Sequence, residues 1–275
     1  MAELIDLVNW VKEKKELSAL SDEIVEGILR TTISKQLIKI IEARSPSELR
    51  RNALAKEEIK QVRMVLRKRY GMFWQGINHE RVIKMIEAGE PEDTILEMHP
   101  STKERLPHYL EVYKEIFSRT GIPKKIVDHA AGLNPLSYKY MNCRPEYVAT
   151  ELAKKDTEII NAFFEVKKIK GNAYPEDIAN NPDSITNYQG DVCFYFKALD
   201  GFEAVQRNIS EKILENTPCR FLVCSFATKS LGGKKQISAS KRTWLEHLAE
   251  EKGWKLESFE IPNELFYVID KGSLS

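Results

Sequence analysis

The spacing of apolar residues changes near residue 120, and this change limits what the chain can fold into. Before it, apolar residues recur at helical intervals, as at Leu4, Leu7 and Val11, and no stretch alternates in the manner of a strand. After it, short apolar runs such as 191–196 and 221–226 are separated by helical stretches. Strands that alternate with helices favour a parallel sheet with helices on both faces. The sequence therefore predicts an all-α domain followed by an α/β domain.

The C-terminal residues depart from this alternation. Residues 254–261 and 264–269 predict two strands joined by the short turn Pro262-Asn263. A terminal hairpin places an antiparallel strand on an otherwise parallel sheet, which is unlike a simple nucleotide-binding sheet and typical of methyltransferases. The predicted fold is a Rossmann-like class I methyltransferase sheet, with a helical domain at 1–105 and the sheet domain at 106–275.

Composition excludes several classes of protein. Hydrophobic residues make up 42% and charged residues 30% of the chain, as in ordered globular proteins. We see no long apolar segment and no secretory signal, so we expect a cytoplasmic protein that does not enter a membrane. The 4 cysteines lack zinc-site spacing, so we expect reduced thiols and no metal.

A candidate cofactor turn runs from Asp128 to Pro135, after a predicted strand. Its single glycine, Gly132, would let the backbone approach a ligand closely. Glu151 follows Asp128 by 23 residues, which is about the distance at which a carboxylate accepts ribose hydroxyls. The turn lacks G-x-G-x-x-G, so a dinucleotide is disfavoured. A plain turn beside a solvated glutamate is the alternative interpretation.

A basic stretch lies between Arg44 and Arg69, where nine Lys or Arg stand against three Glu. On a helix, such an excess could neutralise RNA phosphates, or it could simply be a solvated face. The cations predicted to share one face are Lys56, Lys60, Arg63 and Arg67. A second basic loop, Ser230–Lys235, does not match a phosphate-binding loop and could hold substrate backbone or be an ordinary surface loop.

Five ordered segments resemble the aminoglycoside-resistance 16S ribosomal RNA methyltransferases, the family of the ArmA, Rmt and Sgm types. The segments are His99–Pro107, Asp128–Pro135, Phe196–Leu199 with Glu203, Ser225–Gly232 and Asn263–Ile269. In that family the last four read D-x-A-C-G-x-N-P, K-T-L-P-x-x-E, S-F-P-T-K-S-L-G and N-E-L-x-Y-V-I. Five motifs in matching order are far more specific than any one of them.

The resemblance implies S-adenosylmethionine as cofactor and a role for each matching residue. Arg105 would bind the methionine carboxylate, Glu151 the ribose and Asp177 the adenine amino group. The cofactor would also be lined by Asp128, Ala130, Gly132 and Asn134. The residues implied on the RNA side are Lys197 and Lys229 at the catalytic centre, Lys234 and Lys235 in the basic loop, and Lys60, Arg63 and Arg67 in the helical domain, which would dock on the small ribosomal subunit.

The resemblance thus implies a monomeric enzyme that methylates guanine N7 in the decoding site of 16S rRNA. The chain departs from the family pattern at Glu151 and Ala131, which replace Asp and Cys, at Asp200, which replaces Pro, and at Gln236-Ile237-Ser238, which replaces K-G-M. These last two departures touch the presumed target side. Two alternatives therefore stay open: an RNA- or ribosome-binding protein that has lost catalysis, and a methyltransferase for another RNA or a protein.

Overall fold

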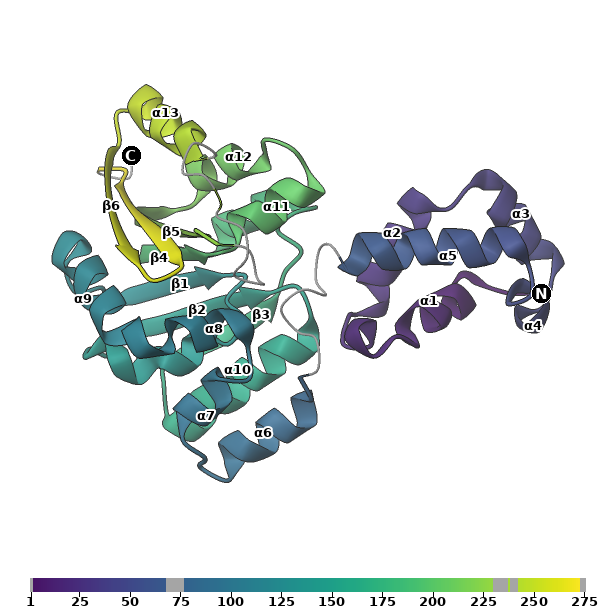
Figure 1. Cartoon of the computed structure of the whole chain (residues 1–275), viewed down its shortest axis with the longest axis horizontal. Helices are drawn as coiled ribbons and strands as arrows, with labels where there is room; N and C mark the ends of the chain where they lie inside the picture. Colours follow the sequence, from purple (N-terminus) through teal and green to yellow (C-terminus); the bar gives the residue numbers. More distant parts are fainter. Residues whose placement is uncertain (1, 68–76, 230–236, 238–241, 273–275) are drawn as a thin grey trace. The chain divides into compact units, whose positions relative to one another are not determined.

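The computed structural model describes residues 2–67, 77–229, 237 and 242–272. The chain divides into two compact units (Figure 1). One comprises Met1–Ile77 with Ala153–Lys155, and the other Asn78–Leu152 with Asp156–Ser275. Among the described helices, none combines the length and the apolar character needed to cross a bilayer.

The first unit is helical. Its helices are α1 (Leu4–Lys12), α2 (Asp22–Thr32), α3 (Lys35–Ala43), α4 (Pro46–Leu49) and α5 (Ala53–Leu66). Short polar side chains start three of them, because each accepts a hydrogen bond from a backbone N–H of the first turn. These N-caps are Ser21 on Ile24, Ser34 on Leu37 and Asn52 on Ala55. The predicted all-α character of the N-terminal part is confirmed.

The boundary between the units lies earlier than the predicted one at residue 105. Helices α6 (His79–Glu87), α7 (Glu92–Leu96) and α8 (Pro100–Arg105) belong to the sheet unit. They are tied to it by polar contacts that sequence spacing does not reveal. Tyr140 donates to Asp93 over 2.7 Å, and Arg105 pairs with Glu264.

The second unit is built on a seven-stranded sheet with the order β3-β2-β1-β4-β5-β7-β6. The strands are β1 (Lys125–His129), β2 (Glu146–Glu151), β3 (Gly171–Pro175), β4 (Gly190–Phe196), β5 (Cys219–Ala227), β6 (Lys255–Ile261) and β7 (Glu264–Asp270). Strands β1 to β5 are parallel, whereas β7 runs antiparallel between β5 and β6. The predicted terminal hairpin is confirmed.

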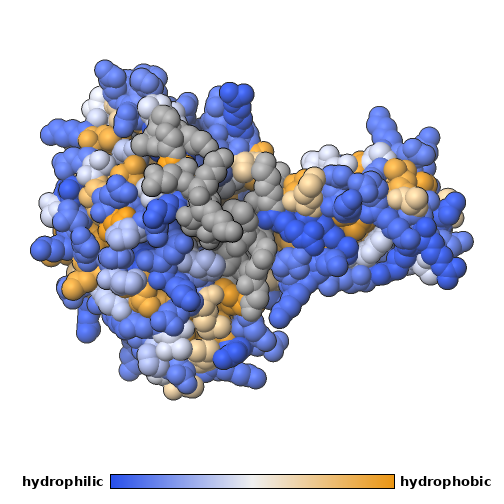
Figure 2. Space-filling view, in the orientation of Figure 1, coloured by the Kyte–Doolittle hydropathy of each residue, from blue (hydrophilic) through white to orange (hydrophobic). Residues whose placement is uncertain are grey.

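Alternate residues of each strand pack on opposite faces of the sheet. On β4, Cys193 and Tyr195 join the core that holds residues of α12 (Ile209–Asn216) and α13 (Thr243–Lys252). Phe194 lies on the other face and contacts Tyr113 of α9 (Tyr109–Thr120), their ring centroids 6.2 Å apart. Among the described residues, two further α-helices are α10 (Lys154–Lys167), which lies in this unit from Asp156 on, and α11 (Leu199–Val205). Apolar residues on the surface visible in Figure 2 are mostly scattered, as is usual for globular proteins.

Candidate active site

A buried ion pair lies at the carboxyl edge of the parallel strands. Arg105, the last residue of α8, and Glu264, the first residue of β7, are each 1% exposed. The Arg105 Nη2 atom lies 2.6 Å from Glu264 Oε1, and Nε lies 3.2 Å from Oε2. Two parallel N–H···O bonds of this kind fix the plane of the guanidinium as well as its position.

The Glu264 carboxylate also contacts Lys197, which directly follows β4, and Ser225, which lies in β5. Ser225 donates its hydroxyl to Glu264 Oε1 over 2.5 Å, and Lys197 Nζ lies 3.4 Å from Oε2. Lys197 also donates to Glu104 over 2.7 Å. Glu264 is therefore a common acceptor for residues from three of the ordered sequence segments.

Electrostatics keep this cluster charged. Burial raises the pKa of Glu264, but Arg105 and Lys197 outweigh burial, and the net pKa lies below its ordinary value. Aromatic rings add cation–π contacts, with the Arg105 Cζ atom 4.8 Å from the centroid of Phe196 and 5.9 Å from that of Phe266. The guanidinium is thus held in a fixed orientation before any ligand binds.

The predicted cofactor turn is connected directly to this cluster. Asn134 accepts from Arg105 Nη1 over 3.1 Å and donates its amide to Asp128 over 2.8 Å. Asp128 is fully buried and also accepts from Tyr147 over 2.7 Å. Burial raises the pKa of Asp128 to about 6, although both hydrogen bonds oppose the shift. The hydrogen bond from Asn134 to Asp128 anchors the turn to the end of β1.

The backbone of the turn has two residues in left-handed conformation, Ala130 at φ 53° and Gly132 at φ 55°. A Cβ added at Gly132 would lie 3.3 Å from His99 Cε1, so even a methyl group would crowd that ring. The structure thus shows why glycine is favoured at 132: the φ angle and the close imidazole both disfavour a side chain.

Glu151 stands at the end of β2, next to this turn. It accepts from the backbone N–H of Gly132 over 2.5 Å and of Leu152 over 3.0 Å. Burial, with a further contribution from Asp156, raises the pKa of Glu151 to about 8. The carboxyl group therefore titrates near pH 8, well above the ordinary pKa of a glutamate.

Asp177 follows β3, the next strand along the edge. It is half-buried and accepts from the side chain of Asn180 over 2.6 Å. Adjacent Glu176 donates its backbone N–H to the carbonyl of Glu151 over 2.8 Å. Three groups thus follow one another along the sheet edge. They are the guanidinium of Arg105 beside β4 and β1, the carboxyl group of Glu151 at β2 and that of Asp177 after β3. This order fits an elongated ligand with a carboxylate, a diol and an amino-bearing base.

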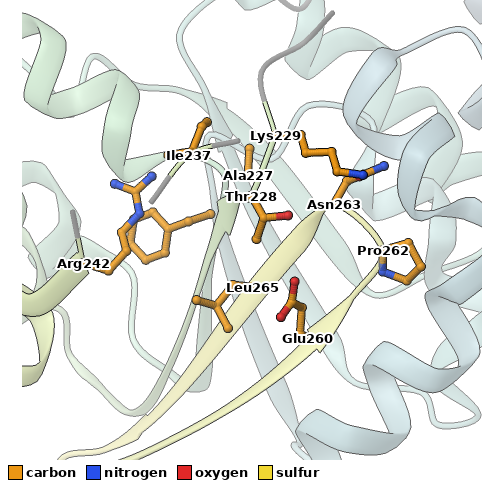
Figure 3. A pocket seen from close by; sticks show the side chains of 10 residues that line it. Ala227, Thr228, Lys229, Ile237, Arg242, Glu260, Pro262, Asn263 and Leu265 are labelled. Carbon is orange, nitrogen blue, oxygen red and sulfur yellow. The ribbon is translucent and has the colours of Figure 1, made fainter. Parts of the chain in front are cut away.

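Lys229 lies just beyond β5 and is exposed. It lines a pocket of about 650 Å³ whose other walls come from the β6–β7 turn and from Arg242 (Figure 3). Arg242 was not predicted as a site residue. The predicted RNA-binding residues Lys234 and Lys235 lie outside the described residues.

The three cations predicted in the helical unit have different surroundings. Lys60 is exposed, with Nζ 3.6 Å from a carboxylate oxygen of Glu57. Arg63 instead donates to the carbonyl of Val11 over 3.3 Å, at the end of α1, and Arg67 donates to Glu16 over 2.8 Å. Arg63 and Arg67 therefore stabilise their own unit, whereas Lys60 presents its charge at the surface.

Comparison with known proteins agrees with this geometry. A family model described as ribosomal RNA methyltransferase (FmrO) matches residues 78–268. A 16S rRNA (guanine(1405)-N(7))-methyltransferase of Micromonospora rosea is 30% identical over 195 residues, covering 68% of this chain and 70% of its own. The enzyme of that name from Proteus mirabilis is 25% identical over 239 residues, covering 77% and 83%.

Solved structures show the same fold. The 16S rRNA methyltransferase RmtF, in complex with S-adenosyl-L-homocysteine, aligns with a TM-score of 0.78 at 20% identity, over 99% of this chain and 100% of that one. The 16S rRNA methylase RmtB aligns with a TM-score of 0.75 at 22% identity, over 99% and 100%. With the match over most of the sheet unit, this chain belongs to the FmrO family of ribosomal RNA methyltransferases.

Proposed function

We propose that this protein transfers a methyl group from S-adenosylmethionine to N7 of a guanine in the decoding site of 16S rRNA. Its substrate is the small ribosomal subunit of the cytoplasm, and it acts as a monomer. The observation that carries this proposal is the cluster at the sheet edge. Arg105, Asn134, Lys197, Ser225 and Glu264 come from the five ordered segments and are joined by hydrogen bonds and ion pairs.

The residues along the edge suit S-adenosylmethionine. Arg105 receives the methionine carboxylate, Glu151 the ribose hydroxyls and Asp177 the adenine amino group, while Ala130 and Gly132 lie in the turn that lines the cofactor. When bound, the cofactor supplies an electrophilic methyl group. The part of the chain is to hold this group rigidly, and the fixed plane of Arg105 supports that role.

Guanine N7 carries an exposed lone pair, so it accepts a methyl group without first losing a proton. The reaction therefore needs no general base, and catalysis comes from alignment. The base must leave its stack to reach the pocket. Lys197 acts on the position of this nucleotide and Lys229 on the RNA beside it, since each follows a strand whose carboxyl end forms the site.

The helical unit supports binding to the folded subunit. Lys60 is the best described candidate for a phosphate contact, because Arg63 and Arg67 bind groups of their own unit. The docking role predicted for residues 1–105 is now best assigned to the unit that ends at Ile77.

A transfer assay tests the proposal. Purified protein is incubated with tritiated S-adenosylmethionine and either isolated small subunits or naked 16S rRNA. We expect label in RNA, and none with Lys197→Ala at equal cofactor affinity. Label in ribosomal protein, or no label despite tight cofactor binding, would contradict the proposal and support one of the two alternatives.

A further inference from the structure

The pocket beside Lys229 lies on the opposite face of the sheet from the Arg105–Glu264 pair. Ser225 and Phe226 are consecutive in β5, so their side chains point to opposite faces. The Ser225 hydroxyl donates to Glu264, whereas the Phe226 ring lines the pocket. Leu265, next to Glu264 in β7, lines it too (Figure 3). The pocket is thus separate from the cluster assigned to the methyl donor.

Arg242 forms a rigid wall of this pocket. Its two terminal nitrogens each donate to Asp200 over 2.7 Å, and its Cζ atom lies 4.2 Å from the centroid of the Phe226 ring. The side chain is 8% exposed. The edge of the guanidinium is therefore fixed by a carboxylate and its plane by an aromatic ring. Asp200 is one of the positions where this chain departs from the family pattern, so the arrangement is a property of this chain.

Charge and shape together limit what the pocket can bind. Two cations, Lys229 and Arg242, are balanced by Glu260 in the lining and by Asp200, the partner of Arg242. A balanced pocket gives a phosphate little net attraction. The rest of the lining combines apolar side chains, from Phe226, Ile237, Pro262 and Leu265, with polar groups from Thr228, Glu260 and Asn263.

Flat apolar faces with hydrogen-bonding edges are the features of a nucleobase, and unpaired bases in RNA are read by stacking on aromatic rings and guanidinium planes. A volume of about 650 Å³ lies in the range of ordinary ligand sites and admits a base with its sugar.

We propose that this pocket receives an unpaired nucleobase of the substrate RNA, a different one from the methyl acceptor. Arg242, oriented by Asp200, is its recognition residue, and Lys229 and Glu260 contact the edges of the base. The proposal rests on the proposed function for the identity of the RNA. It adds a second point of contact, on the opposite face of the sheet from the Arg105–Glu264 pair, which would help to select the site that is methylated.

Two variants of the full chain test this subsite. Arg242→Lys keeps the charge and removes the planar group, and Leu265→Trp fills the pocket while Arg242 itself is kept. The matched control is Arg220→Lys. Arg220 also forms a two-bond pair, with Asp270 at 2.9 Å and 2.9 Å, and lies 4.6 Å from the centroid of Phe221, but at the opposite end of β5.

The dissociation constant for isolated small subunits is measured with S-adenosylhomocysteine present. Cofactor affinity is followed by calorimetry and stability by thermal melting. We expect both pocket variants to weaken subunit binding by about tenfold or more, because a stacked base is lost. Their cofactor affinity should match the wild type, and Arg220→Lys should change neither constant. Should Arg242→Lys melt early, Leu265→Trp still decides the question.

The proposal is overturned if Leu265→Trp melts normally and binds small subunits as tightly as the wild type. It is also overturned if Arg220→Lys weakens subunit binding as much as the pocket variants do. Because binding is measured without transfer, the two proposals fail separately. A protein that binds subunits through the pocket yet transfers no methyl group contradicts only the proposed function. A protein that methylates RNA with no loss in either pocket variant contradicts only the subsite.

Discussion

Two arginine–carboxylate pairs stand at opposite ends of β7. Arg105 pairs with Glu264, the first residue of the strand, and Arg220 pairs with Asp270, the last. Both are two-bond pairs, with N···O distances of 2.6 and 3.2 Å in the first and 2.9 and 2.9 Å in the second. Local chemistry therefore does not distinguish them.

Their surroundings do. The side chains of the first pair are 1% and 1% exposed, and those of the second are 53% and 23% exposed. Glu264 also forms an ion pair with Lys197 and accepts a hydrogen bond from Ser225, whereas the side chains of the second pair are in contact with solvent. An exposed pair contributes little to stability, and a buried one is costly to break because the remaining charge has no solvent. The sheet edge therefore keeps a buried charge cluster that positions its members, at a place where apolar residues would pack without the cost of burying charge.

The largest expected effect is on stability. Glu264→Ala leaves Arg105 and Lys197 buried without their shared carboxylate, and we expect a loss of about 3–5 kcal/mol in the free energy of unfolding. Asp270→Ala should leave the unfolding midpoint within error. Urea denaturation of both variants measures the difference, and equal losses would show that burial does not separate the two pairs.

The comparison extends to the backbone beside the buried pair. Gly132→Ala combines strain at φ 55° with contact to His99, whereas Gly253, at φ 67°, has open space around its Cβ position. We expect Gly253→Ala to cost about 1–2 kcal/mol, as expected of left-handed backbone, and Gly132→Ala to cost more and weaken S-adenosylhomocysteine binding. Calorimetry measures the affinity for S-adenosylhomocysteine, and denaturation measures the loss of stability. Equal losses of stability in Gly132→Ala and Gly253→Ala would show that His99 does not crowd position 132.

A third expectation concerns pH. Glu151 keeps its proton up to about pH 8 in the folded protein, because its pKa is raised to that value, while an unfolded glutamate loses its proton near the ordinary pKa of 4.5. Between these values the folded state binds more protons, so this group's contribution to stability falls as pH rises. Ribose hydroxyls donate to the carboxylate form, so cofactor affinity should rise between about pH 6 and pH 9.

Glu151→Gln is the matching control, since it cannot titrate. Above about pH 8 we expect about tenfold weaker cofactor binding than in the wild type, because a charged acceptor is lost, and we expect no rise in affinity with pH attributable to this position. A wild-type affinity that stays constant over the same range would contradict the assignment of Glu151 to the ribose.

The smallest effect separates two cations of α5. Arg63 donates to a carbonyl at the end of α1, so Arg63→Ala should cost about 1 kcal/mol of stability in the helical unit. Lys60→Ala should leave stability unchanged and weaken binding to small subunits, with a reduced salt dependence. Sedimentation of the protein with small subunits at two salt concentrations measures this binding. A loss of stability in Lys60→Ala and a loss of subunit binding in Arg63→Ala would contradict the roles given to the two residues.

Sequence patterns predicted the parts of the fold that depend on local spacing. They predicted the buried strands β4 and β5 and the hairpin of β6 and β7, because each of these segments is a distinct apolar run in the sequence. Strand β3 was not predicted, since among its residues only Ala173 is buried and the strand ends at Pro175. The domain boundary was placed too late because α6 to α8 look like any other helices until their tertiary contacts are known.

The candidate site was predictable in part for the same reason. Arg105, the glycine turn and Lys197 lie in motifs, but the partner of Arg105 is 159 residues away along the chain. A glutamate at the start of an apolar strand, as in Asn263-Glu264-Leu265, is the one local hint that a buried counter-ion exists. Arg242 gives no such hint, because its significance depends on Asp200 and Phe226 in space.

The most direct test of the central claim is chemical mapping of the modified base. RNA from small subunits treated with the protein and S-adenosylmethionine is reduced with borohydride and cleaved with aniline, which breaks the chain at N7-methylguanine, and the ends are located by primer extension. We predict one strong cleavage, at a guanine of the decoding site, absent without S-adenosylmethionine and absent with Arg105→Ala. Methyl incorporation into the RNA without aniline-sensitive cleavage would contradict the assignment to guanine N7.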